Sequence, residues 1–324
     1  MASDHHGGTF VVARGEADIA GLRGAVVAIG NFDGVHRGHQ RLIESARALA
    51  ERRSAPAAIL TFEPHPRAFF APGKPMFRLT PETEKLIVLR RLGLDGVIVR
   101  RFDADLAATT AEDFVTGLLV RDIGASGVVV GHDFHFGKGR AGTPEVLADL
   151  ARRQDIACEV VPVVAEDGEA VSSSAIRAAL EAGAVERANR LLGYIWFATG
   201  DVRHGEKRGR DLGYPTANMR LPDGCGLRHG IYAVRMAVDG VIRDGVASFG
   251  RRPTFDNGAP LLETFLFEFS GDLYGKTVAV EFVSFLRGEE RFESIADLVA
   301  QMDRDSAASR AILAQPATER SMIA

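Results

Sequence analysis

The amino-acid sequence predicts two domains: an α/β domain with a doubly wound parallel sheet, then a small antiparallel β-barrel with a C-terminal helix. The chain has 324 residues, which is long enough for two hydrophobic cores. Its first half alternates short apolar runs with helically spaced segments, a pattern typical of a parallel sheet covered on both faces. Its second half contains strand-like runs at short spacing, which is typical of a small barrel.

The first half predicts strands and helices in alternation. The apolar runs predict strands at 25–30, 57–62, 96–100, 127–131 and 158–164. The helically spaced segments are 40–52, 82–92, 111–121 and 143–153. Thr143 is suited to cap the last of these helices, with Pro144 at its first position. In such sheets ligands bind at the carboxyl ends of the strands, near the topological switch point.

The pattern changes near residues 183–193. An alanine-rich segment, 174–192, predicts a helix that ends at Gly193. The strand-like runs beyond it are 196–202, 231–238, 241–249, 261–269 and 277–286. Asp239-Gly240 is a strong hairpin signal, and an amphipathic segment at 294–303 predicts the final helix. The expected domains are 10–185 and 186–310, followed by a tail at 311–324.

Composition narrows the classes of function. The net charge of −4 argues against a general nucleic-acid or membrane-surface binder, which needs a strongly basic field. Cys158 and Cys225 are too few for a disulfide framework or a four-ligand zinc site, so a reduced, cytoplasmic compartment fits best. No apolar run is long enough to span a bilayer, and residues 1–8 lack the layout of a secretory signal.

A first candidate site follows the first strand, where residues 29–39 run I-G-N-F-D-G-V-H-R-G-H. The helix that starts there presents free amides to an anion. His36 and His39 are three residues apart, so both can point to one place and stabilise charge on a phosphate. Asn31 and Asp33 add polar groups. A single histidine would favour a structural role, but two histidines with glycines at this turn favour function; a zinc site lacks a third ligand.

Other turns follow later strands of the same sheet. Residues 61–67 carry two prolines around His65, and residues 131–140 carry three glycines with two basic residues. Ordinary loops are the alternative for both. In the segment 171–177 the serines are candidate caps of a helix. Equally, Ser173, Ser174 and Arg177 are suited to hold phosphate, because arginine binds it through two hydrogen bonds.

A second candidate site lies at 200–219. Its glycines let backbone amides approach a polyphosphate, and Pro215 fixes the turn that follows. Thr216 and Asn218 then offer hard oxygen atoms, which suit Mg²⁺ with a nucleotide phosphate. Two phosphate-binding turns in one chain predict two sites and more than one reaction.

Both motifs point to one family. The chain resembles the bifunctional prokaryotic riboflavin kinase/FAD synthetases from about residue 26 to 305. Its first half is similar to their FMN adenylyltransferase module, a Rossmann-like nucleotidyltransferase domain with an H-x-G-H motif, here 36–39. Its second half resembles their riboflavin kinase module, whose hallmark run G-R-x-L-G-x-P-T-A-N is here 209–218.

The resemblance implies a kinase step that moves the γ-phosphate of ATP to the ribityl hydroxyl of riboflavin, giving FMN and ADP. It assigns the base to Glu263 and the hold on Mg²⁺ to Thr216 and Asn218. From the residues alone, Glu263 would be a carboxylate on a solvated strand face. The residues implied to close over the nucleotide are Gly205, Lys207, Gly209, Gly213 and Pro215.

The resemblance also implies transfer of AMP from ATP to FMN, giving FAD and pyrophosphate, by orientation and charge stabilisation. His36 and His39 would contact the triphosphate, with Ser174 and Arg177 on the pyrophosphate. Further nucleotide-binding residues would be Gly30, Asn31, Phe32, Asp33, Gly38 and Ser173. Residues expected to contact the flavin are His65, Pro66, Phe134, Phe136 and Arg291, the last of which otherwise forms a surface ion pair.

Some positions depart from the family pattern. Ser174 replaces a usual threonine, Ser248 a common asparagine and Glu268 a common aspartate, while Thr264-Phe265 replaces a small apolar residue and histidine. Two alternatives therefore stay open: a monofunctional enzyme with one degenerate module, and a flavin-binding regulator without turnover. The sequence leaves open the oligomeric state, the preferred metal, FMN channelling, the redox state of the flavin and the role of 306–324.

Overall fold

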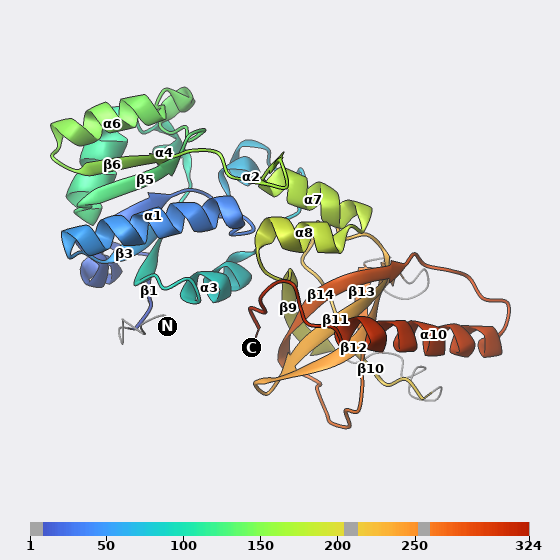
Figure 1. Cartoon of the computed structure of the whole chain (residues 1–324). Helices are drawn as coiled ribbons and strands as arrows, with labels where there is room; N and C mark the ends of the chain where they lie inside the picture. Colours follow the sequence, from blue (N-terminus) through green and yellow to red (C-terminus); the bar gives the residue numbers. More distant parts are fainter. Residues whose placement is uncertain (1–8, 204–212, 252–259, 324) are drawn as a thin grey trace. The chain divides into compact units, whose positions relative to one another are not determined.

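The computed structural model describes residues 9–203, 213–251 and 260–323 (Figure 1). The chain forms two compact units. The first comprises Met1–Met76 and Val88–Val171, and the second comprises Phe77–Ile87 and Ser172–Ala324. The second unit thus includes a short segment from the first half of the sequence. The functional boundary expected at 185–186 stays a prediction.

The first unit is built on a six-stranded parallel sheet, which confirms the predicted α/β class. The strands in spatial order are β1 (Val11–Ala13), β4 (Gly96–Arg101), β3 (Ala57–Glu63), β2 (Val26–Ile29), β5 (Gly127–Gly131) and β6 (Ala157–Val161). Strand β1 was not predicted, because three residues are too few to stand out as an apolar run.

The order of the strands locates the topological switch point of the sheet. From β2 the chain proceeds to β3 and β4 on one side, then returns to β5 on the other side of β2. The carboxyl ends of β2 and β5 are therefore where a ligand is expected to bind. The turn that carries the two histidines of the first site leaves β2 at this place.

The helical segments of the first half follow the predicted order. They are η1 (Glu16–Leu22), α1 (Arg37–Arg53), α2 (Pro66–Phe70), α3 (Glu82–Arg90), α4 (Ala104–Ala108), α5 (Ala111–Asp113), η2 (Phe114–Ile123), η3 (Lys138–Arg140) and α6 (Pro144–Arg153). Thr143 caps α6 by accepting from the backbone NH of Val146 at 3.4 Å, as predicted. The predicted helix 111–121 is π-helical from Phe114 onward.

The second unit contains a closed antiparallel barrel, which confirms the prediction for the second half. Its strands in spatial order are β10 (Thr216–Met219), β13 (Pro260–Leu266), β12 (Val241–Arg251), β11 (Gly230–Val238), β14 (Thr277–Arg287) and β9 (Phe197–Arg203). The segment predicted as one helix, 174–192, is two: α7 (Ser173–Ala182) and α8 (Val185–Leu192). The break lies at Gly183, whose φ of +79° ends α7 in the left-handed conformation.

The final helix, α10 (Ile295–Leu313), is longer than predicted and extends into the expected tail. It lies along β11 and β12 of the barrel (Figure 1). Leu313 near its end packs against Ala233, Val246 and Phe267 of the barrel. The tail beyond α10 also contacts the second unit: the backbone NH of Ile195 donates to the carbonyl of Arg320 at 3.0 Å.

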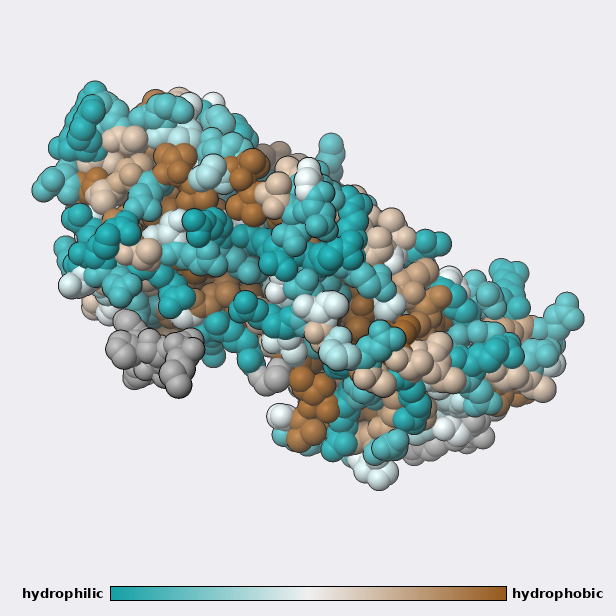
Figure 2. Space-filling view, in the orientation of Figure 1, coloured by the Kyte–Doolittle hydropathy of each residue, from teal (hydrophilic) through white to brown (hydrophobic). Residues whose placement is uncertain are grey.

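The surface drawn in Figure 2 is covered mostly by hydrophilic residues, with apolar residues in scattered patches. None of the helices in the described residues is long and apolar enough to cross a membrane.

Candidate active sites

The turn between β2 and α1 has an unusual backbone. Phe32 and Val35 adopt left-handed φ values of +49° and +38°, which side chains with a Cβ rarely take. Both side chains are fully buried, so packing holds the backbone in this shape. Strained residues of this kind cluster at ligand sites, where the surrounding structure stabilises them.

His36 and His39 lie together at the start of α1. His36 is the N-cap, and its Nδ1 accepts from the backbone NH of His39 at 3.3 Å. The proton of the neutral ring is therefore on Nε2. The two rings stack with centroids 3.7 Å apart and an interplanar angle of 18°. The predicted pairing of the two imidazoles at a helix N-terminus is thus present.

Gly38 lies close to this stack. A Cβ at this position would lie 3.1 Å from both Cε1 and Nδ1 of His36, which is a tight contact. The glycine of the H-x-G-H motif therefore leaves room for the ring of the first histidine.

The turn after β2 is joined to strand β3. Thr61 donates its hydroxyl to the carbonyl of Asn31 at 3.2 Å. His65 caps α2 by accepting from the backbone NH of Arg67 at 3.0 Å, with Pro66 at the first helical position. Asp33 is buried close to the motif. The structure therefore gives His65 a structural role, and its contact with a flavin stays a prediction.

The turn after β5 carries two stacked rings. Phe134 and Phe136 lie with centroids 5.5 Å apart, and Phe136 also packs against Phe114 at 5.1 Å. Phe136 is buried in the hydrophobic core of the first unit, while Phe134 is only partly buried. Phe136 thus supports Phe134 instead of lining an open surface, and the flavin contact of both residues stays a prediction.

The serine-rich turn belongs to the second unit. Ser172 caps α7 by accepting from the backbone NH of Ala175 at 3.2 Å, which was the structural alternative for these serines. Ser173 begins the helix and Ser174 is exposed. Arg177 donates from Nε to the carbonyl of Phe77 at 2.6 Å. Binding of pyrophosphate by these residues stays a prediction.

The second site is formed by three neighbouring strands. Asn218 of β10 and Ser248 of β12 are the register partners of Glu263 in β13. Residues opposite each other in an antiparallel pair share a face, and so do residues two apart in a strand. Thr216, Asn218 and Glu263 therefore lie on one face, as the predicted metal and base roles need.

Asn218 is suited to hold a cation. Its side chain is buried, and its Nδ2 donates to the carbonyl of Thr216 at 3.3 Å. Its Oδ1 is also buried and has no hydrogen-bond partner within the described residues. A buried amide oxygen needs a partner, and Mg²⁺ beside a nucleotide phosphate would supply one.

A cavity of about 530 Å³ opens beside Pro215, Thr216 and Ala217. Its other walls come from β9, from β13 and from the segment after β13. The residues of that segment are Phe269, Ser270, Gly271, Asp272, Leu273 and Tyr274. These residues were not predicted as part of a site, although two aromatic residues around a glycine after a strand were a usable signal.

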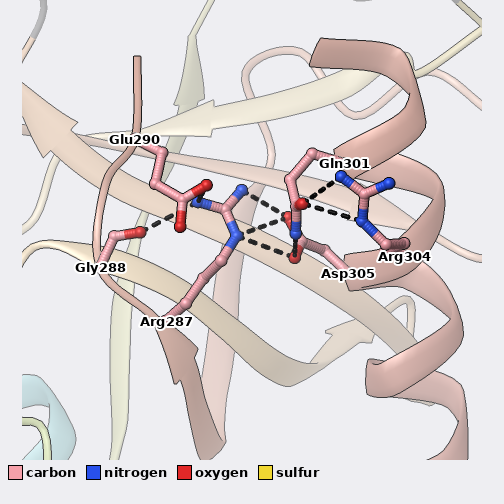
Figure 3. Close-up of polar contacts among 6 residues, drawn as sticks. All are labelled: Arg287, Gly288, Glu290, Gln301, Arg304 and Asp305. Atoms are coloured by element: carbon pink, nitrogen blue, oxygen red, sulfur yellow. Dashed lines mark hydrogen bonds and ion pairs between the residues drawn. The ribbon is translucent and has the colours of Figure 1, made fainter. Parts of the chain in front are cut away.

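Polar contacts fix α10 to the barrel (Figure 3). Arg287 of β14 donates to both carboxylate oxygens of Asp305, with Nη2 to Oδ2 at 2.7 Å, and Gln301 donates to Oδ1 at 2.8 Å. The hydrogen bonds to Asp305 raise the pKa of the Arg287 guanidinium above its ordinary value. Because Asp305 is buried and fully bonded, the position of α10 is well defined.

Comparisons with known proteins follow the same division of the chain. A family model described as FAD synthetase matches residues 18–175, and one described as riboflavin kinase matches residues 192–313. A bifunctional riboflavin kinase/FMN adenylyltransferase of Pseudomonas fluorescens is 40% identical over 299 residues, which are 92% of this chain and 96% of that protein. This chain belongs to the bifunctional riboflavin kinase/FMN adenylyltransferase family.

A second relative and a solved structure also match most of this chain. The protein of the same name from Escherichia coli strain K12 is 38% identical over 288 residues, which are 89% of this chain and 92% of that protein. A crystal structure described as a macrolide-efflux protein from Streptococcus pneumoniae has a TM-score of 0.84 and 31% identity, covering 93% of this chain and 99% of that one. The family resemblance seen in the sequence is confirmed.

Several predicted nucleotide-binding residues of the kinase module cannot be placed. Gly205, Lys207 and Gly209 lie outside the described residues. Gly213 is exposed, with a φ of +84° that favours glycine, and Pro215 is exposed next to the cavity. Arg291 is exposed in the segment between β14 and α10, and its contact with a flavin stays a prediction.

Proposed function

We propose that this chain makes FAD from riboflavin in two steps. A kinase step converts riboflavin and ATP into FMN and ADP, and an adenylyl transfer converts FMN and ATP into FAD and pyrophosphate. One observation carries this proposal: each half of the chain matches the family model of one of the two activities. The alternatives of a degenerate module and of a regulator have no support, because both sites keep their functional residues.

In the kinase step Glu263 accepts the proton of the ribityl hydroxyl as its oxygen attacks the γ-phosphorus of ATP, and the bond to the β-phosphate breaks. Asn218, opposite Glu263 in the register, and Thr216 on the same face would hold Mg²⁺. The ion would neutralise charge on the phosphates. The cavity beside Thr216 offers apolar and aromatic walls for the nucleotide.

In the adenylyl transfer a phosphate oxygen of FMN attacks the α-phosphorus of ATP, and pyrophosphate leaves. The attacking group is already an anion, so the site needs no strong base. His36 and His39 donate hydrogen bonds to the triphosphate, and the amides at the start of α1 add positive charge. The strained turn 32–35 holds these donors in place before the substrate binds.

We also propose that the enzyme works in the reducing cytoplasm. Cys158 and Cys225 are both free. Free thiols are typical of proteins in a reducing compartment.

Chromatography of the products tests the function. The protein is mixed with riboflavin, ATP and Mg²⁺, and the flavins are separated over time. We expect FMN first and FAD later, with both lost when EDTA removes the metal. A single product would indicate one active module, and none would indicate a binding protein.

A further inference from the structure

Tyr214 lies in the hallmark run of the kinase module, between Gly213 and Pro215 and two residues before Thr216. Its side chain is buried, and its hydroxyl donates to Oδ1 of Asp303 in α10. This hydrogen bond joins the turn before Thr216 to the final helix.

The ring of Tyr214 contacts β13, the strand that carries Glu263. It packs against Phe265 of β13 with centroids 4.8 Å apart. Phe265 is the register partner of Thr216, and it lies two residues from Glu263 on the same face. One side chain thus contacts the strand of the base through its ring and α10 through its hydroxyl.

The helix that carries Asp303 is itself fixed. Asp305 is bound by Arg287 (Figure 3), and the buried Ser309 donates to the carbonyl of Gly245 at 2.9 Å. The guanidinium of Arg310 lies 4.0 Å from the ring centroid of Phe267. The hydroxyl of Tyr214 is therefore bound to an acceptor whose place is set by the barrel.

We propose that Tyr214 is a positioning residue for phosphorylation of riboflavin. Its hydrogen bond to Asp303 holds the turn 213–216 against α10, so that Thr216 stays in register with Phe265 and in place relative to Glu263. This inference rests on the kinase function proposed above. Small displacements of groups that orient a phosphate have large effects on rate, so the bond affects turnover more than the binding of riboflavin.

The test compares single substitutions at both ends of the bond. Tyr214→Phe keeps the ring on Phe265 and removes only the hydroxyl. We expect the kcat of riboflavin phosphorylation to fall about fivefold, with KM for riboflavin nearly unchanged and conversion of supplied FMN to FAD as in the wild type. Asp303→Ala gives the same loss, and Asp303→Asn, which keeps an acceptor oxygen, retains most of the rate. The double variant Tyr214→Phe/Asp303→Ala is no slower than either single one.

Tyr232→Phe is the matched control. Tyr232 is a buried tyrosine in β11 of the same barrel, and its hydroxyl donates to the carbonyl of Arg228 and not to α10. We expect this variant to lose stability without losing kcat per folded molecule. An unchanged kcat in Tyr214→Phe, additive losses in the double variant, or an equal loss of kcat in Tyr232→Phe would overturn the inference. Wild-type protein without kinase activity would instead overturn the proposed function.

Discussion

Asn218 and Glu263 are register partners across β10 and β13, and Ser248 lies on the other side of Glu263. The pairing places a buried amide oxygen, suited to a metal ion, beside the carboxylate assigned as base. The side chains proposed to hold the metal and to act as base are thus carried by paired strands of the barrel. Side chains fixed in this way can move little. Substitutions that change one chemical group and keep the shape of the side chain therefore test its role best.

Glu263→Gln removes the base and keeps the shape. We expect phosphorylation of riboflavin to fall by about 10²–10⁴-fold, the typical contribution of a general base. Conversion of supplied FMN to FAD continues. Glu268→Gln, which changes an exposed carboxylate paired with Arg310, is the control and keeps both activities. Loss of both activities in Glu263→Gln would show that the two modules are not independent.

His36→Asn removes one of the two stacked imidazoles of the first site. Asparagine is a good N-cap, so α1 keeps its cap and the fold is preserved. We expect FAD formation to fall by about 10²-fold, the scale seen when one stabilising donor is removed, while FMN accumulates from riboflavin. Product analysis at several times checks both rates. Unchanged output of FAD would remove the assignment of His36.

Glu84→Ala tests the attachment of the segment Phe77–Ile87 within the second unit. The buried carboxylate accepts from the backbone NH of Thr199 at 2.9 Å and from its hydroxyl at 2.6 Å. Its removal leaves donors without an acceptor, at a cost of about 1–3 kcal/mol in the free energy of unfolding. Urea unfolding measures the change, and Glu84→Gln, which keeps an acceptor oxygen, should lose less. An alanine variant with the wild-type midpoint would contradict this account.

Glu281 should make stability depend on pH. It is fully buried in β14, and its Oε1 accepts from the backbone NH of Met322 in the tail at 2.9 Å. Burial raises the pKa of this carboxyl above 4.5 in the folded chain. The folded chain therefore keeps a proton that the unfolded chain loses, and the contribution of Glu281 to stability decreases as pH rises from about 4.5 through the raised pKa.

Glu281→Gln cannot ionise, and it keeps an oxygen for Met322. Its Tm relative to the wild type should therefore increase from pH 5 to pH 8. Thermal melts at these two values measure the difference. A constant gap between the two proteins at both values would show that Glu281 does not titrate in this range.

Much of the fold was predictable because the core has a regular pattern. The buried strands β2 and β5 are unbroken apolar runs, β3 is apolar except for Thr61 and Glu63, and Thr143-Pro144 marks the start of α6. The length of α10 was not predictable, since its buried face includes Asp305 and Ser309. These polar residues are buried only because the barrel supplies Arg287 and the carbonyl of Gly245 as partners.

In the sites, too, contacts between residues close in sequence were predictable, and contacts between distant residues were not. His36 and His39 are close in sequence, so their spacing on a helix predicts their contact. Tyr214 and Asp303 are 89 residues apart, and their contact depends on how α10 packs. The opposition of Asn218 and Glu263 likewise depends on strand register, which no local pattern states.

The central claim is that one chain carries two complete and separate sites, and a mixing experiment tests it most directly. Glu263→Gln, His36→Asn and an equal mixture of both receive riboflavin, ATP and Mg²⁺, and the flavins are separated. We predict little FMN or FAD from the first variant, FMN with little FAD from the second, and much more FAD from the mixture than from either variant alone. FAD made from riboflavin at the wild-type rate by either variant alone would contradict the claim.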